Sequence, residues 1–201
     1  MANKTNSQSS VKQAIKSVIQ KTVTICATFG GVGYSWVMPG TMGSFATLVV
    51  AFAVQFNILY MAIMFMVSTI VGAMVSGSYA KRIKKQDPKE VVIDEVSGMF
   101  MILWLCGLYK EETFAVIKHY IPNTEIITAW QNDALLSGLS FAIPAFILFR
   151  LFDIIKPFPI SYIDKHIKGS LGIMLDDILA AFFGTIVFVL SILMINANIN
   201  A

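Results

Sequence analysis

The chain has 201 residues, of which 56% are hydrophobic and only 13% are charged. Because soluble domains carry about 25% charged residues, this composition is atypical of a soluble enzyme. The formal net charge of +3 is small, and we expect membrane lipids, and no nucleic acid, as partners.

The first 21 residues are polar and lack the compact apolar core of a cleaved signal peptide. Val11, Ile15 and Val18 recur at helical spacing, while Lys12 and Lys16 lie on another face. This pattern predicts an amphipathic helix that lies on the cytoplasmic surface of an anionic membrane. A solvated tail is the alternative interpretation, for residues 1–10 above all.

No charged residue or histidine occurs between Lys21 and Lys81, a stretch longer than two membrane spans of about 20 residues each. Hydropathy predicts five apolar segments, which are residues 43–56, 58–80, 91–109, 132–155 and 171–195. The first is short, and it forms either a tight hairpin or a re-entrant element with the second. We therefore expect a single domain, residues 1–201, with an all-α fold. It is a polytopic membrane helical bundle of about five transmembrane or re-entrant helices plus the N-terminal amphipathic helix.

Lysine and arginine are distributed unevenly along the chain. With the N-terminus inside and five crossings, 13 of the 15 basic residues fall in residues 1–21, 81–90 and 150–168, which are the predicted cytoplasmic segments. This is the positive-inside bias of membrane proteins, and a basic face suits anionic lipid head groups. Five acidic residues are then expected at the same membrane level, namely Asp94, Glu95, Asp153, Asp176 and Asp177.

A polar motif, PGTMGS at residues 39–44, precedes the first apolar segment. Its glycines and the hydroxyls of Thr41 and Ser44 at a helix N-terminus are typical of an anion site. A simple turn between spans is the alternative interpretation.

The first pair of acids follows the motif DPKE, residues 87–90. This motif predicts a helix with Asp87 as N-cap and Pro88 in the first position, which puts Asp94 and Glu95 about two turns inside the helix. A carboxylate at the centre of a membrane helix costs about 3 kcal/mol on insertion scales. The pair therefore needs a cation or a water-filled pocket, unless it forms a solvated acidic collar.

Arg150, Asp153 and Lys156 recur every three residues on one helical face, and Pro157 is expected to end that helix. One interpretation is a local ladder of salt bridges. In the other, Arg150 and Lys156 bind a phosphate, and Asp153 holds one of them or a metal.

Asp176 and Asp177 are the only charged residues between Leu171 and Ile195. Adjacent helical side chains differ by about 100° in direction, so the two aspartates reach one site only from its two flanks. A small-residue stripe at helical spacing lets another helix approach, and the expected neighbour is the helix that carries Asp94 and Glu95. Carboxylates held together repel unless a divalent cation or protons neutralise them. Mg²⁺ suits an all-oxygen site, and a proton relay is the competing explanation.

Four stretches, residues 39–44, 87–98, 149–160 and 169–180, together resemble the phosphatidylglycerophosphatase A family, and the resemblance extends over about residues 39–184. It implies a Mg²⁺-dependent lipid phosphatase, multi-pass in the bacterial inner membrane, with its active site facing the cytoplasm. Such an enzyme hydrolyses the anionic phospholipid phosphatidylglycerophosphate to phosphatidylglycerol and inorganic phosphate.

The resemblance and the charge pattern together suggest a role for each candidate residue. The predicted Mg²⁺ ligands are Asp94, Glu95 and either or both of Asp176 and Asp177. One carboxylate of the catalytic set, which also includes Asp153, accepts a proton from the attacking water. The predicted phosphate-binding residues are Thr41, Ser44, Arg150 and Lys156.

Other functions remain open on sequence alone. A small membrane transporter or proton relay also uses clustered carboxylates, but it requires them near the midplane of the membrane. A structural membrane protein leaves the five acids unexplained. A CDP-alcohol phosphotransferase is expected to have a long aspartate-rich helix signature that this chain lacks.

Overall fold

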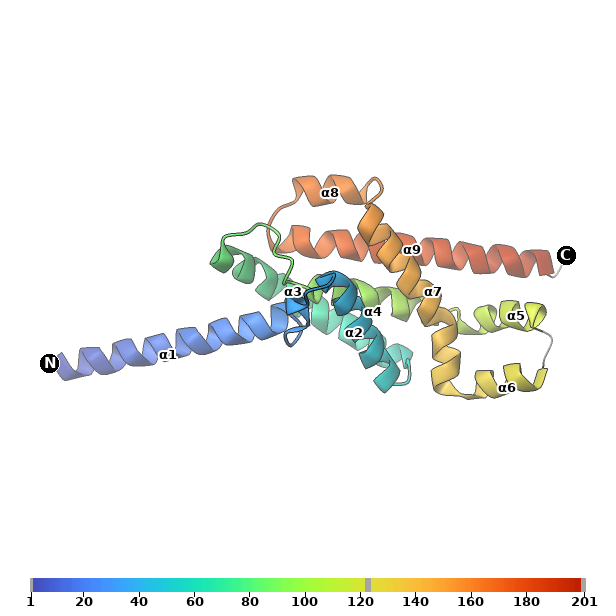
Figure 1. The fold of residues 1–201 in the computed structure, drawn as a ribbon, viewed down its shortest axis with the longest axis horizontal. Helices are drawn as coiled ribbons and strands as arrows, with labels where there is room; N and C mark the ends of the chain where they lie inside the picture. Colours follow the sequence, from blue (N-terminus) through green and yellow to red (C-terminus); the bar gives the residue numbers. More distant parts are fainter. Residues whose placement is uncertain (1, 122–123, 200–201) are drawn as a thin grey trace.

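The computed structural model describes residues 2–121 and 124–199, and over these ranges it contains α-helices and one 3-10 turn but no β-strand. The elements shown in Figure 1 are α1 (Ala2–Ala27), η1 (Val32–Tyr34), α2 (Pro39–Ala53), α3 (Ile58–Ile83), α4 (Ile93–Gly107), α5 (Lys110–Tyr120), α6 (Thr124–Asn132), α7 (Ala134–Ile155), α8 (Ile160–His166) and α9 (Ser170–Ile199). The prediction of an all-α membrane bundle is confirmed.

Three of the described helices, α3, α7 and α9, are long and apolar enough to cross a membrane. The other two predicted segments form α2 and α4, each of 15 residues. At 1.5 Å per residue such a helix is about 22 Å long, shorter than the hydrocarbon core of about 30 Å. All five apolar segments are therefore helical, but only three have the length of a full span.

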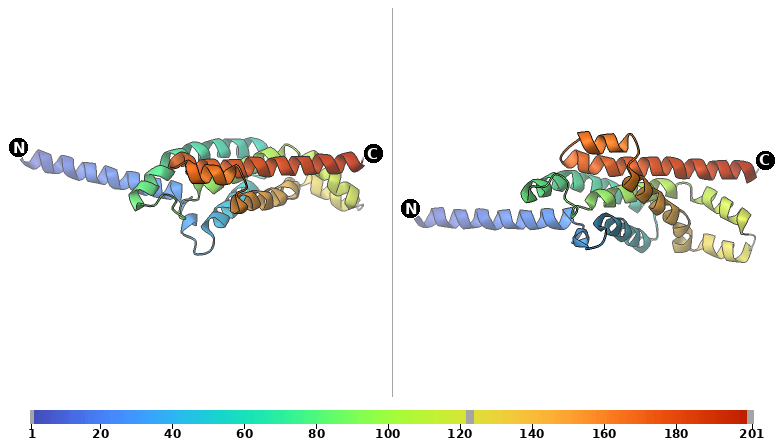
Figure 2. Two further views of the ribbon diagram at one scale, coloured as in Figure 1. Left: turned by 90° about the horizontal axis from the view of Figure 1, so that it is seen from above. Right: turned by 45° about the horizontal axis from the view of Figure 1, so that its top comes forward.

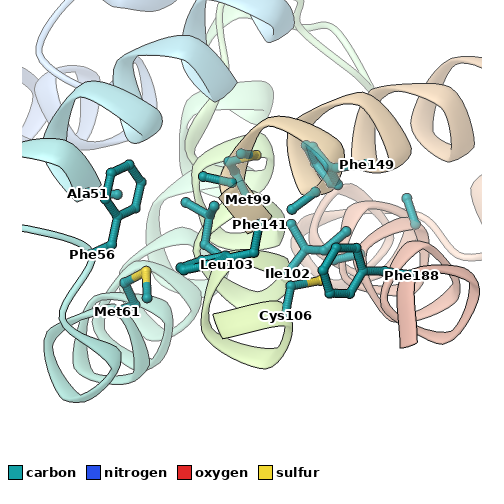
Figure 3. Packing of buried hydrophobic residues seen from close by; sticks show 14 of the residues in the cluster. Ala51, Phe56, Met61, Met99, Ile102, Leu103, Cys106, Phe141, Phe149 and Phe188 are labelled. Atoms are coloured by element: carbon teal, nitrogen blue, oxygen red, sulfur yellow. The ribbon is translucent and has the colours of Figure 1, made fainter. Parts of the chain in front are cut away.

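Helix α4 lies at the centre of the molecule, and 11 of its 15 residues are buried. It packs against α2, α3, α7 and α9. Figure 3 shows part of this core, where Ile102 and Cys106 lie beside Phe188 of α9. Because α4 is surrounded by protein, its length does not have to match the thickness of the lipid.

The close packing of α4 depends on a small residue. A Cβ atom added at Gly98 would lie 2.6 Å from the Phe149 ring of α7 and 2.9 Å from the backbone oxygen of Asp177 in α9. Helices in a membrane associate through such close contacts, because lipid supplies little hydrophobic drive between them. Gly98 therefore sets how near the N-terminal half of α4 lies to α9.

The predicted N-cap at Asp87 is wrong, because α4 begins at Ile93. Residues 85–92 are irregular, and their end is held by tertiary hydrogen bonding: the backbone N–H of Val92 donates to the carbonyl of Ala27 at the end of α1, at 3.0 Å. The side chains of Val91 and Val92 are also buried. These long-range contacts outweigh the local capping signal of the DPKE motif.

The shifted start changes the position of the first acidic pair. Asp94 and Glu95 lie in the first turn of α4, not two turns inside it as the sequence predicted. The positive end of the helix dipole favours negative charge at this position. The dipole of α4 therefore helps to stabilise the negative charges of the pair, an effect that the position predicted from the sequence did not include.

The molecule is elongated, and Figures 1 and 2 show its two ends clearly. Helix α1 extends beyond the other helices at one end, while α5, α6 and the C-terminus of α9 lie at the other. The apolar side chains of Val11, Ile15 and Val18 on α1 are exposed, but so is every other residue from 10 to 22, and exposure therefore does not test the predicted amphipathic face. Helix α1 points along the same long direction as α9, whereas a helix lying on the membrane surface runs across it. The surface location of this helix stays a prediction.

Candidate active site

The charged residues of distant segments surround one cavity of about 480 Å³. It lies where the N-termini of α2 and α4, the C-terminus of α7 and the first turns of α9 meet. The charged residues that line it are Asp87, Lys89, Asp94, Glu95, Arg150, Asp153, Lys156, Asp164, Lys165, Lys168, Asp176 and Asp177. The structure thus brings together all five acids that the sequence placed at one membrane level.

Three carboxylates form the innermost group, which we call the carboxylate cluster: Asp94, Glu95 and Asp177. One oxygen from each residue lies within 4.8 Å of the others. Asp94 and Asp177 are only 8% and 3% exposed. Among the described residues, Oδ1 of Asp94 and Oε2 of Glu95 are buried without a hydrogen-bond partner.

The cluster is held together by the N-termini of α4 and α2 and by the close contact between α4 and α9. Asp94 and Glu95 are adjacent in the first turn of α4, and the contact at Gly98 brings Asp177 of α9 beside them. The N-terminus of α2 reaches the same place, since a Cβ atom at Gly40 would overlap the carboxylate of Glu95. A larger residue at Gly98 would meet the backbone of α9, whereas one at Gly40 would displace the side chain of Glu95.

Asp176 has a different partner from its neighbour Asp177. Its Oδ2 lies 2.5 Å from Nζ of Lys156, which also lies 3.0 Å from Oδ1 of Asp164. The two aspartates face different groups because they are adjacent on a helix. Sequence left open which aspartate joins the acids of α4, and the structure places Asp177 there.

Lys156 caps the C-terminus of α7, just before Pro157, as the sequence predicted. Burial lowers the pKa of its ammonium group, but the hydrogen bonds and charges of Asp176 and Asp164 outweigh this effect and raise the pKa above the ordinary value. Lys156 is therefore a permanent cation at the edge of the cavity near neutral pH.

Arg150 forms the expected contact with Asp153, at 2.6 Å between Nη1 and Oδ2. The predicted ladder does not continue to Lys156, which binds acids of α8 and α9 instead. Nη1 of Arg150 also donates to Oγ of Ser44 at 3.4 Å. Arg150 and Lys156 both line the cavity. Each already contacts a carboxylate, so a bound phosphate group would share the cation with that carboxylate.

The hydroxyl residues of the PGTMGS motif do not belong to the described lining of the cavity. Of this motif, Pro39 and Gly40 line the cavity, whereas Thr41 and Ser44 are absent from its described lining. Oγ of Ser44 donates to the carbonyl of Gly40 and contacts Arg150, so it helps to position that side chain. Oγ1 of Thr41 is buried without a partner among the described residues. Direct phosphate binding by these hydroxyls stays a prediction.

Sequence reasoning missed Asp164, the second partner of Lys156, and treated Lys165 and Lys168 only as part of a basic loop. All three line the cavity. They reach it because α8 folds back after Pro157, and acidic residues in polar loops are too common to stand out. One signal could have indicated Asp164. Lys156 lies at the predicted end of a helix, and Asp164 is the next acidic residue after the turn that follows.

The carboxylate cluster has the properties of a site for a hard divalent cation. The salt bridges among the described residues pair Arg150 with Asp153 and Lys156 with Asp176, which leaves the cluster without a direct ion pair, although the positive charge of Arg150 also acts on Glu95. Buried carboxylates are stable only when charges or protons compensate them. Three oxygens from three side chains, with buried lone pairs available, fit Mg²⁺, which takes few protein ligands and keeps several waters.

Comparison with known proteins agrees with the resemblance seen in the motifs. A family model described as phosphatidylglycerophosphatase A matches residues 25–192. The Phosphatidylglycerophosphatase A of Haemophilus influenzae is 30% identical over 155 residues, covering 74% of this chain and 76% of that protein. The protein of the same name from Escherichia coli is 30% identical over 152 residues, covering 75% and 72%.

A third relative, from Bacteroides thetaiotaomicron, is 27% identical over 161 residues, covering 78% of this chain and 84% of that protein. It carries a provisional name as a phosphatidylinositol-3-phosphatase. No solved structure matches the chain. The family match over most of the chain, with two relatives at 30% identity, shows that the chain belongs to the phosphatidylglycerophosphatase A family.

Proposed function

We propose that this enzyme hydrolyses phosphatidylglycerophosphate to phosphatidylglycerol and inorganic phosphate, that it requires Mg²⁺, and that it acts at the cytoplasmic face of the bacterial inner membrane. Family membership makes it a membrane phosphatase with a phospholipid substrate. Beyond family membership, we propose the requirement for Mg²⁺, the location in the bacterial inner membrane and the action at its cytoplasmic face.

The observation that carries the proposal is the carboxylate cluster in a cavity that also contains two cations. Asp94, Glu95 and Asp177 would hold Mg²⁺. When bound, Mg²⁺ supplies Lewis-acid polarisation of the phosphate and lowers the pKa of a bound water. Arg150 and Lys156 attract the phosphomonoester into the cavity and offset its charge.

Asp176 is suited to move the proton of the attacking water. Its Oδ2 is held by Lys156, while its Oδ1 is buried without a partner among the described residues. In the proposed reaction the water oxygen bonds to phosphorus and Oδ1 accepts a water proton. The bond between phosphorus and the glycerol oxygen breaks, and that proton passes to the departing oxygen. Cysteine and histidine are absent from the described cavity lining, so direct attack by water agrees with the residues at hand.

The basic residues support the cytoplasmic side. Residues 81–90 and 150–168, with nine of the 15 basic residues, lie around the same end of the molecule as the cavity. Lys110 and Lys118 lie on α5, toward the opposite end. The positive-inside rule then orients the cavity toward the cytoplasm.

Transport or a proton relay is less well supported by this geometry. Asp176 and Asp177 lie in the second turn of the 30-residue helix α9, only about 10 Å from its N-terminus at 1.5 Å per residue. A relay across the membrane needs ionisable groups near the midplane. The cluster lies near one end of the bundle instead.

The proposal is tested with purified protein in neutral detergent micelles, by measuring phosphate released from phosphatidylglycerophosphate. We expect release with Mg²⁺, its loss in EDTA and its return when Mg²⁺ is restored. The Asp94→Asn, Asp177→Asn double variant should be inactive, while Glu125→Gln, an exposed acid on α6, should match the wild type. Activity that persists in EDTA, or in the double variant, would contradict the proposal.

A further inference from the structure

A second hollow adjoins the catalytic cavity on the side of α3. It has a volume of about 480 Å³ and lies between the C-terminal turns of α3 and the N-terminus of α9. Four lysines line it, and we call it the lysine groove: Lys81, Lys84, Lys85 and Lys168. None of these residues has a role in the proposed hydrolysis.

The groove and the cavity share part of their lining. Gln86, Lys168 and Gly169 line both. The two spaces therefore adjoin at these three residues. The groove lies on the side of the cavity where α3 is exposed.

The lysines of the groove have charge available for a ligand. Lys81 and Lys84 form no ion pair with any residue in the described ranges. Lys85 has only a loose, exposed contact with Glu90 at 3.5 Å. Nζ of Lys168 donates to a backbone carbonyl, that of Asp164, at 3.3 Å. The groove thus presents several cations and no compensating carboxylate in its described lining.

The floor of the groove is apolar and leads toward the membrane. A Cβ atom at Gly77 would lie 3.2 Å from Cβ of Ser170, so α3 and α9 are in contact beneath the lysines. Met74 lines the groove one turn away and is 71% exposed. Ile70, one further turn along the span, is 61% exposed. A lipid whose head group lay on the lysines could keep its acyl chains along this face of α3.

The chemistry of the proposed substrate fits two adjoining anion sites. Phosphatidylglycerophosphate has a terminal phosphomonoester and an internal phosphodiester, joined by a glycerol. We propose that the lysine groove binds the phosphodiester while the phosphomonoester occupies the catalytic cavity. This inference rests on the proposed function, and it makes the groove a determinant of specificity for lipids that carry both groups.

The two products are separate probes for the two sites. Dioctanoyl phosphatidylglycerol contains the phosphodiester alone, and inorganic phosphate resembles the monoester alone. Binding of each to the protein in neutral micelles is measured by calorimetry, which does not depend on turnover. For the Lys81→Gln, Lys84→Gln variant we expect a Kd for the lipid about 30-fold weaker, since each of the two lysines contributes about 1 kcal/mol near a lipid surface and about 1.4 kcal/mol corresponds to a tenfold change. The Kd for phosphate should not change.

A charge-matched control is Lys110→Gln, Lys118→Gln on α5, which should bind both products as the wild type does. An unchanged Kd for the lipid in the groove variant, or equal weakening for lipid and phosphate, would overturn the inference. So would inhibition of wild-type turnover by the lipid that is not competitive with substrate, because a site for bulk anionic lipid would behave that way. Failure of the proposed function appears separately, as wild-type protein that binds the lipid but releases no phosphate.

Discussion

Asp176 and Asp177 show how much chemistry depends on the direction of a single side chain. Asp177 joins the acids of α4, while Asp176 binds the cation that ends α7. Two residues with the same charge and similar burial therefore have different expected roles. One is a candidate ligand for Mg²⁺, and the other is a candidate proton acceptor fixed by Lys156.

The two aspartates can be separated by their dependence on Mg²⁺. Asp177→Asn should raise the Mg²⁺ concentration needed for half-maximal activity by about 100-fold or more, because loss of a direct ligand should exceed the 10–100-fold effect typical of outer partners. Asp176→Asn should lower kcat while leaving that concentration within about tenfold of wild type. A Mg²⁺ titration of both variants measures this. Equal shifts in the two variants would refute the distinction.

The bridge from Lys156 to Asp176 should be visible in stability. Removing one partner of a buried ion pair costs about 3–5 kcal/mol, and since Lys156 is 27% exposed we expect about 2 kcal/mol for Lys156→Ala. In the Lys156→Ala, Asp176→Ala variant the loss should be smaller than the sum of the single losses. Thermal unfolding in detergent tests this, with Lys165→Ala as the exposed control. Additive losses would show that the two side chains are not coupled.

The same bridge has a defined pH dependence. Because the pKa of Lys156 is raised in the folded protein, the bridge stabilises fully below the ordinary lysine value of 10.5 and loses its effect only as pH rises through the raised value. We expect the stability difference between wild type and Lys156→Ala to be constant from pH 7 to about pH 9. A difference that decreased over this interval would contradict the assigned pKa direction.

At the scale of elements, the sequence predicted which acids lie close together better than it predicted where the helix that carries two of them begins. Asp94, Glu95 and Asp177 were identifiable because charges within apolar segments are rare and need a reason. The sequence placed the start of α4 too early, because the hydrogen bond from Val92 to Ala27 that fixes the preceding segment joins parts of the chain that are distant in sequence. The facing of Asp176 and Asp177 depends on how α9 is rotated against α4, which only three-dimensional packing determines.

The contact between α4 and α9 at Gly98 is open to a direct test. Gly98→Ala should lower stability by about 1–3 kcal/mol through overpacking, although alanine favours a helix by about 1 kcal/mol over glycine. It should also lower activity, since the added methyl group pushes Asp177 away from Asp94. Unfolding and phosphate release are measured together. Gly107→Ala is the matched control, because its Cβ meets no backbone atom within 4 Å and its nearest side-chain contacts, at 3.2 Å or more, are longer than those at Gly98.

At the scale of the whole molecule, the sequence correctly separated a basic end from an end with few cations. The all-α class and the five helical segments also followed from hydropathy. The lengths of α2 and α4 did not, because hydropathy does not distinguish a span that faces lipid from a short helix buried among others. The packing of α4 by four neighbouring helices supplies that distinction.

Sidedness is tested with cysteine variants in intact spheroplasts, using a thiol reagent that does not cross membranes. With Cys26 and Cys106 replaced by serine, a cysteine at Lys165 should react only after the membrane is made permeable. A cysteine at Lys118 should react from outside, since α5 lies at the opposite end of the bundle. Labelling of the Lys165 position in intact cells would contradict the proposed orientation.

The shortness of α4 has a consequence for how the enzyme responds to its membrane. When a bilayer thickens or thins, lipid-facing helices adapt to hydrophobic mismatch by tilting, and α3 and α9 are exposed to this force. Helix α4 is enclosed by protein and does not meet the acyl chains along most of its length. Asp94 and Glu95 should therefore keep their depth relative to the surrounding helices, so that changes in acyl-chain length alter the path of the lipid more than the reacting groups.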